Sequence, residues 1–219
     1  MNLIMISQTP LFRGTAPQEA GAMLKCLSAY TRRYAKGEII CRAGEPFSAL
    51  AMVLEGGVTI ESDDVWGNRS ILSHIGAGEI FAETYACLPG EPLLVNAVAA
   101  EKAEVLFMDM GKLTTVCPGG CSHHNRLVQN LLSLTARKNL TLSRRILHTS
   151  SKTIRGRLVS YFSDQALLQG SCRFSIPFNR QQLADYLGVD RSALSHELSK
   201  MKREGLIAYE KNRFTLIQP

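Results

Sequence analysis

Short runs of alternating apolar and polar residues, separated by glycines, occupy residues 30–109. Such runs cover residues 38–45, 49–61, 70–81 and 94–109. Alternation with a period of two predicts strands, and this spacing is typical of an all-β sandwich or barrel. A short helix is expected before the strands, around residues 17–28. Glycine reaches positive φ angles without strain. The glycines expected in turns are Gly44, Gly56, Gly57, Gly67, Gly76, Gly78 and Gly90.

A helical pattern begins after Cys121 and continues for about 25 residues. One stripe, spaced like the a and d positions of a coiled coil, consists of Val128, Leu132, Thr135, Asn139, Leu142 and Ile146. A second stripe consists of Leu127, Leu131 and Leu134. One stripe can pack on the β-domain and the other on a second copy of the chain, which predicts a dimerisation helix. The alternative is a helix that packs only within its own chain.

The last third of the chain predicts a pair of short helices. A helix over residues 152–168 and a strand within residues 171–178 precede this pair. Asn179, with Gln182 three residues later, can form a reciprocal N-cap, and Gly188 is placed to end the first helix. The pair therefore starts with a short, well-delimited helix.

Asp190 can cap a second helix, over residues 191–203, which Gly205 ends. The two helices are expected to pack through Leu183, Ala184, Leu187, Leu194, Leu198 and Met201. The opposite face then carries Arg191, Ser192, Ser195 and His196. A hairpin follows, with its turn at Lys211 and Asn212.

This polar face has the chemistry that reading of the DNA major groove requires, because donors near the start of a recognition helix reach base edges. Arg191 is the best candidate for guanine O6 and N7, and the hairpin can act as a wing that touches phosphates. The residues expected to contact DNA are Arg180, Gln181, Arg191, Ser192, Ser195, His196 and Lys211. A helical pair used only for protein contacts or core packing is the alternative.

Charge is unevenly distributed along the chain. Residues 1–136 carry 10 Lys and Arg against 13 Asp and Glu, whereas residues 137–219 carry 15 against 6, a net charge of +9. Such a surplus on a small domain suggests a polyanionic partner, most simply nucleic acid. A basic, solvated face is the alternative.

The composition is that of an ordinary globular protein, with 219 residues of which 45% are hydrophobic. No window approaches the roughly 18 uninterrupted apolar residues of a membrane helix, so we expect a soluble protein. The start, MNLIMISQTPLF, lacks the features of a secretion signal, which predicts a cytoplasmic location. Most of the six scattered cysteines are expected to be thiols, with Cys41, Cys87 and Cys172 packed in strands.

The segments RQQLADYLGVDRSALSHELSKMKREGLI and YAKGEIICRAGEPFSALAMVLEGGVTI resemble the CRP/FNR family of bacterial transcription regulators. The resemblance covers nearly the whole chain. It implies an α+β fold with an N-terminal jelly-roll-like β-roll over 1–120, a dimerisation helix over 121–148 and a C-terminal winged helix-turn-helix over 149–219. It also implies a homodimer on a roughly palindromic double-stranded DNA site and a contact with RNA polymerase.

The effector pocket departs from the family pattern. Glu83 matches the glutamate that holds the ribose of a cyclic nucleotide, but the Arg-Ser pair that holds its phosphate falls on Leu93 and Leu94. A leucine cannot donate a hydrogen bond to a phosphate. The adenine-contacting Thr-Ser pair falls on Leu142 and Ser143. With Thr84 these residues form the candidate pocket, and cyclic AMP is not expected to be the effector. An apolar ligand, or no ligand with the roll filled by leucine, remains open.

Cysteine and histidine raise two further possibilities. Iron-sulfur sensors of the family carry a cysteine cluster near the N-terminus, where this chain has only Cys26, so no such cluster is expected. Just before the long helix lie Cys117, Cys121, His123 and His124. They can bind a soft metal or form a regulatory disulfide, or they are small buried cysteines at a polar helix start. A jelly-roll metalloenzyme would need several inward histidines, but residues 30–109 contain only His74, so no enzyme is expected.

Overall fold

The computed structural model describes the chain except residues 1, 65, 67–68, 89, 115–121 and 218–219. The described residues form two compact units, 1–136 and 137–219. The division falls inside the longest helix, α5 (Ser122–Thr149), so that its first half belongs to one unit and its second half to the other.

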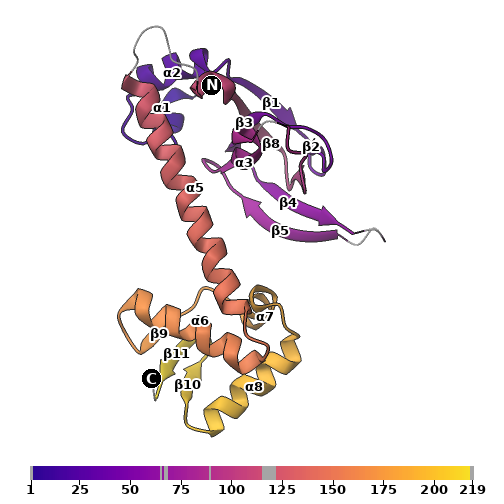
Figure 1. The fold of residues 1–219 in the computed structure, drawn as a ribbon, viewed down its shortest axis with the longest axis vertical. Coiled ribbons are helices and arrows are strands. Elements are labelled where there is room, and N and C mark those ends of the chain that lie inside the picture. The colour runs from indigo at the N-terminus through magenta and orange to yellow at the C-terminus, as the bar shows by residue number, and fades with distance from the viewer. Residues whose placement is uncertain (1, 65, 67–68, 89, 115–121, 218–219) are drawn as a thin grey trace. The chain divides into compact units, whose positions relative to one another are not determined.

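The first unit contains two antiparallel four-stranded sheets (Figure 1). One sheet has the order β1 (Tyr30–Tyr34), β8 (Ala103–Asp109), β3 (Ala49–Glu55) and β6 (Ile80–Phe81). The other has the order β2 (Ile39–Cys41), β7 (Asn96–Ala99), β4 (Val58–Asp63) and β5 (Arg69–Ile75). Side chains from both sheets, including Val53, Val58 and Phe107, share one buried cluster. The expected β-roll is confirmed.

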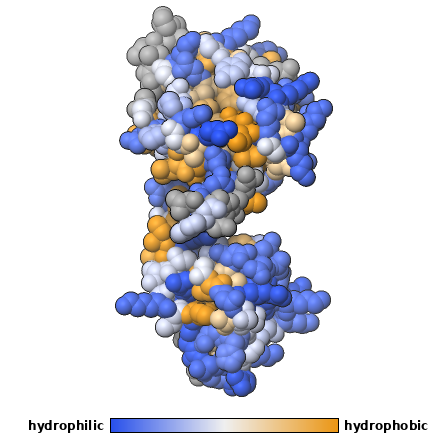
Figure 2. Space-filling model, turned by 90° about the vertical axis from the view of Figure 1, so that its right-hand side faces the viewer, coloured by the Kyte–Doolittle hydropathy of each residue, from blue (hydrophilic) through white to orange (hydrophobic). Residues whose placement is uncertain are grey.

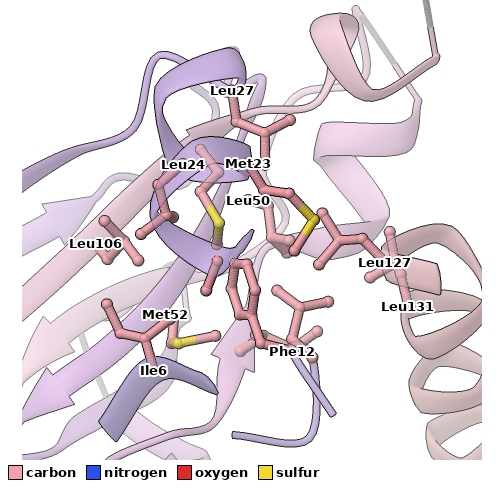
Figure 3. Packing of buried hydrophobic residues seen from close by; sticks show 14 of the residues in the cluster. Ile6, Phe12, Met23, Leu24, Leu27, Leu50, Met52, Leu106, Leu127 and Leu131 are labelled. Carbon is pink, nitrogen blue, oxygen red and sulfur yellow. The ribbon is translucent and has the colours of Figure 1, made fainter. Parts of the chain in front are cut away.

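Short helices cover the first sheet and hold the start of α5 (Figure 3). They are α1 (Leu3–Ser7), α2 (Pro17–Cys26) and α3 (Glu83–Cys87). A fourth short helix, α4 (Gly111–Thr114), follows β8. Leu127 and Leu131 of α5 are buried against residues of α2, β3 and β8, and Leu134 is partly buried there. Asn130 adds a polar anchor, because its Nδ2 donates to the main-chain oxygens of Leu11 and Arg13, both at 2.9 Å. The second predicted stripe therefore packs on the β-domain, as expected.

Gly57 and Gly76 lie between strands, as expected, but without the expected φ, and two of the cysteines lie outside strands. Gly57 and Gly76 lack the positive φ that Gly44, Gly56, Gly78 and Gly90 adopt, and Gly67 lies outside the described residues. At Gly57 the reason for glycine is space, since a Cβ atom would lie 2.6 Å from the ring of His74. Of the cysteines expected in strands, only Cys41 lies in one. Cys87 ends α3 and Cys172 precedes β9, and both are exposed.

The second unit is a three-helix core beside a small sheet. Its helices after α5 are α6 (Ile154–Gln169), α7 (Arg180–Leu187) and α8 (Arg191–Arg203). The sheet has the order β10 (Ile207–Glu210), β11 (Arg213–Leu216) and β9 (Arg173–Ser175), all antiparallel. The buried cluster beneath it contains all six residues predicted to pack the helix pair, together with Leu158, Phe162 and Phe214. The predicted order of helices, strand and hairpin is confirmed.

Candidate nucleic-acid interface

The helices α7 and α8 are held at their starts by side-chain caps. Asn179 Oδ1 accepts from the Gln182 amide at 2.9 Å, and Gln182 Oε1 accepts from the Asn179 amide at 2.9 Å. Gly188 ends α7 with φ 63°. Asp190 Oδ1 then accepts from the Ala193 amide at 2.9 Å and starts α8. These bonds fix the turn between the helices, as the sequence predicted.

The cap of α8 also occupies one residue of the predicted DNA-contacting face. The hydroxyl of Ser192 donates to Asp190 Oδ1. Hydrogen bonds from the Ser192 hydroxyl and the Ala193 amide lower the pKa of the Asp190 carboxyl, so this cap is ionised at neutral pH. Ser192 therefore supports the start of α8 and keeps only its acceptor lone pairs for another partner.

Arg157 of α6 holds the turn between α7 and α8, and the sequence did not predict this role. Its Nη1 donates to the main-chain oxygens of Leu187 at 2.8 Å and Gly188 at 3.0 Å, while its Nε donates to Ser151 O at 2.8 Å. These bonds satisfy carbonyl groups that the end of α7 leaves unpaired. The sequence of α6 does not predict the contact with α7, because these acceptors are backbone oxygens about 30 residues further along the chain.

The outer face of α8 is open to solvent. Arg191 and His196 are exposed and Ser195 is half-buried. Within the described parts of the chain, the Arg191 guanidinium has no hydrogen-bond or ion-pair partner. Figure 2 shows hydrophilic residues over most of the visible face of the second unit. Arg191 at the capped start of α8 thus has its donors available for a ligand.

Two carboxylates, one on the inner edge of α8 and one at its C-cap, share a single arginine of α6. Arg155 Nε lies 2.6 Å from Glu197 Oε1, and Nη1 lies 2.7 Å from Glu204 Oε2. The hydrogen bond from Arg155 lowers the pKa of the Glu204 carboxyl. The bonds to Glu204 and Glu197 raise the pKa of the Arg155 guanidinium. Pairing of both carboxylates leaves the charge of α8 dominated by its cations. Those cations are Arg191, Lys200, Lys202 and Arg203.

The wing lies beside the start of α7. Its turn is at Lys211 and Asn212, as predicted, and Lys211 is exposed with φ 51°. Arg180, also expected to contact DNA, is only partly exposed and donates from Nη2 to Lys211 O at 3.0 Å. Gln181 is exposed, and its Nε2 donates to Asp185 Oδ1 at 2.8 Å. The structure therefore brings the predicted DNA-contacting residues into one domain, but they differ in exposure and in the hydrogen bonds that already occupy their donors.

The candidate effector residues are spread over both units. Glu83 is buried at the start of α3, and Leu93 is buried in the cluster between the sheets. Leu94 is 78% exposed, and Thr84 is also exposed. Leu142 and Ser143 belong to the second unit, where both are exposed. A second buried carboxylate, Glu61 of β4, accepts from Thr59 Oγ1 at 2.6 Å and was not found from the sequence.

The candidate metal or disulfide cluster cannot be placed. Cys117 and Cys121 lie outside the described residues, and so does the side chain of His123. His124 is buried at the start of α5. Among the residues that the structure describes, no three His, Cys, Asp or Glu side chains gather as metal ligands.

A β-roll connected by a long helix to a winged helix-turn-helix defines a two-domain class of DNA-binding regulators. The chain matches the cyclic nucleotide-binding domain over residues 31–118 and the Crp-like helix-turn-helix domain over residues 156–219. It belongs to the CRP/FNR family of transcription regulators. It is therefore a DNA-binding transcription regulator and not an enzyme. In the described part of the chain, no helix has the length and apolarity to cross a membrane.

Individual relatives support this assignment. The chain is 30% identical over 204 residues to the cyclic AMP receptor protein of Thermus thermophilus, covering 91% of this chain and 88% of the relative. It is 24% identical over 197 residues to the transcriptional activator protein FnrL of Cereibacter sphaeroides, covering 86% and 76%. The crystal structure of the Thermus thermophilus catabolite activator protein aligns with a TM-score of 0.53 and 25% identity, covering 95% of this chain and 93% of that one.

Proposed function

We propose that the protein is a homodimer that binds a roughly palindromic DNA site and reads base edges with the outer face of α8. The observation that carries this proposal is the open start of α8, where Arg191 is exposed and, among the described residues, unpaired beside an ionised cap. A guanidinium in this position can donate to guanine O6 and N7 together. His196, one turn further along, and Ser195 are the other base or phosphate contacts of the proposal.

The dimer is proposed from the first stripe of α5. Val128 is 42% exposed, Leu132 67%, Leu142 61% and Ile146 67%. Apolar side chains left open at coiled-coil spacing along one helix are a surface that a second copy can cover. Thr135 and Asn139 complete the stripe, and a polar residue at such a position fixes the register of a coiled coil. Two half-sites about 34–36 Å apart would then face the two recognition helices.

The effector of the proposal is not cyclic AMP. Leu93 fills the space between the sheets, and Leu94 faces solvent, so neither offers a donor to a cyclic phosphate. A regulator with an apolar effector or with a permanently filled roll fits this interior. The cytoplasmic location and a contact with RNA polymerase complete the proposal by analogy with the family.

The proposed reading of DNA is tested by selecting sites from a random pool of double-stranded DNA with the purified, reduced protein. A palindrome with half-sites one helical turn apart is the expected result, together with tighter binding to the selected site than to scrambled DNA. Added cyclic AMP is expected to leave this affinity unchanged. Enrichment of no sequence by the full-length protein, with and without cyclic AMP, would contradict the proposed sequence reading.

The proposed dimer is tested by sedimentation of Leu132→Lys. A lysine in the exposed stripe places two like charges in the proposed interface, so this variant is expected to become monomeric. Leu167→Lys is the matched control, because Leu167 is 81% exposed on α6 and outside the stripe. Sedimentation of the unaltered protein as a monomer at micromolar concentration would rule out the proposed dimer.

A further inference from the structure

Arg180 is the first residue of α7, and its side chain is packed against the wing. The guanidinium carbon lies 4.9 Å from the ring centre of Tyr209 and 5.1 Å from that of Phe214. Its Nη2 donates to the main-chain oxygen of Lys211 at 3.0 Å. Contacts of a guanidinium with two aromatic rings and one carbonyl define its place closely. One side chain thus ties the start of the helix-turn-helix to both strands and the turn of the wing.

One further nitrogen of Arg180 is withdrawn from solvent. Its Nη1 is shielded from solvent and has no hydrogen-bond partner within the described part of the chain. Burial lowers the pKa of the guanidinium. A cation at the start of a helix is also disfavoured by the helix dipole. The stability of α7 therefore does not explain an arginine at this position.

The acceptor of Arg180 belongs to a wing residue with an unfavourable backbone conformation. Lys211 has φ 51°, a conformation that residues other than glycine, Asn and Asp seldom adopt. It follows directly on the last pair of the hairpin, Glu210 with Arg213. The direction in which the Lys211 ammonium points depends on this backbone conformation. The bond from Arg180 holds the carbonyl of that same residue.

We propose that Arg180 is a positioning residue for DNA binding, which holds the wing so that Lys211 meets a phosphate and which does not itself contact DNA. The inference rests on the proposed function, because it needs a site that the protein binds. It separates Arg180 from Arg191, whose donors are open. The opposing possibility is that Arg180 donates directly to a second phosphate.

The salt dependence of binding separates these two roles. Each lysine or arginine that neutralises a phosphate contributes about 0.9 to the slope of log affinity against log salt concentration. The slope is measured on the selected site for the unaltered protein, Arg180→Ala, Lys211→Ala and the double variant. We expect the slope to fall by about 1 in each single variant and no further in the double variant, because both changes remove the same phosphate contact. Arg137→Ala, which removes one exposed charge from α5, controls for the change in net charge.

A fall of about 2 in the double variant would overturn the proposal, since Arg180 would then have a phosphate of its own. Arg180→Lys keeps the positive charge but cannot bridge two rings and a carbonyl, so it is expected to behave like Arg180→Ala. Unaltered binding by Arg180→Lys, with a thermal midpoint like that of the unaltered protein, would also overturn it. This comparison of single and double variants requires a DNA site that the unaltered protein binds more tightly than scrambled DNA. Failure to find such a site counts against the proposed function, whereas additive slopes count only against the role of Arg180.

Discussion

Helices α7 and α8 both begin with an Asn or Asp cap that is followed at once by an arginine, yet the two arginines have different surroundings. At the start of α7, Arg180 lies between Tyr209 and Phe214 and bonds to the wing. At the start of α8, Arg191 is exposed and unpaired among the described residues. The local sequence signals are alike. The difference comes from the hairpin, which covers one helix start and leaves the other open.

The same contrast extends along both helices. Besides Arg180, α7 is tied inward by Tyr186, whose hydroxyl lies 2.9 Å from His148 Nδ1 at the end of α5. α8 is held along its inner edge, where Arg155 pairs with Glu197 and Glu204, and near its end, where Lys202 Nζ lies 5.1 Å from the ring centre of Tyr209. The outer face of α8 therefore stays open for the DNA contact proposed for it. The helix with inward contacts instead supports the geometry of the domain.

The largest effect is expected from Arg191→Ala. Removal of a bidentate contact to guanine costs about 1 to 3 kcal/mol on the selected site and little on scrambled DNA. Arg191→Lys should lose most of the same affinity, because a single ammonium does not match both acceptors of guanine. Fluorescence anisotropy on both DNAs measures the difference. Equal losses of affinity for the selected site and for scrambled DNA would show that Arg191 contacts a phosphate. Arg191 would then not differ from Arg180 by reading bases.

The two caps are expected to stabilise the fold while differing in their effect on DNA binding. Asn179→Ala should lower the free energy of unfolding by about 1 kcal/mol, because an amide of α7 loses its acceptor. Asp190→Ala should also destabilise the protein, and it releases the Ser192 hydroxyl on the face proposed to contact DNA. Urea unfolding gives the stabilities, and binding is compared at temperatures where each variant stays folded. We expect only Asp190→Ala to alter specific affinity there; an equal change in Asn179→Ala would show that both helix starts matter alike.

A smaller effect on stability is expected from pH, through His148, which contacts Tyr186 of α7. Burial lowers the pKa of His148 below its ordinary 6.5, and nearby Arg144 acts in the same direction, while Asp164 opposes both. Below pH 6.5 the unfolded chain therefore takes up a proton that the folded chain does not. Stability should fall as pH drops from 6.5 toward the lowered pKa, and this contribution should be constant above 6.5.

Thermal unfolding of the unaltered protein and of His148→Phe, over a series from pH 7.5 to 5, isolates this contribution from the other histidines. The phenylalanine keeps ring contacts with Tyr161 and Tyr186 but cannot take up a proton. The difference between the two proteins should change only below pH 6.5. A difference that is constant over the whole series would contradict the role assigned to the burial of His148.

Much of the fold follows from local patterns. The caps at Asn179 and Asp190 were predictable because their partners lie three residues away. The buried stripe of α5 was predictable because apolar spacing determines which residues share a helix face. Gly57 lies between β3 and β4, as expected for a turn glycine, but its φ is not positive, and its closest neighbour is the ring of His74 on β5. Contacts between residues a few positions apart in the chain can thus be predicted from the sequence, whereas contacts between neighbouring strands cannot.

The site was predictable only in part, for the same reason. Arg180 and Arg191 have equivalent places in the sequence, and only the wing, some 30 residues further on, distinguishes them. Leu93 and Leu94 are neighbours, but Leu93 joins the buried cluster while the amide of Leu94 donates to the Tyr85 hydroxyl at 3.1 Å and its side chain is exposed. Arg155 and Arg157 were missed because their partners belong to other helices. Tertiary contacts decide which of several similar side chains remains free.

The most direct test of this account is a parallel selection of DNA sites by the unaltered protein, Arg180→Ala and Arg191→Ala. The account predicts that Arg180→Ala selects the same sequence as the unaltered protein with weaker binding, whereas Arg191→Ala loses the preference at one base pair in each half-site. The opposite pattern, with base preference lost in Arg180→Ala and retained in Arg191→Ala, would contradict the central claim that the open arginine of α8 reads the sequence and the covered arginine of α7 positions the wing.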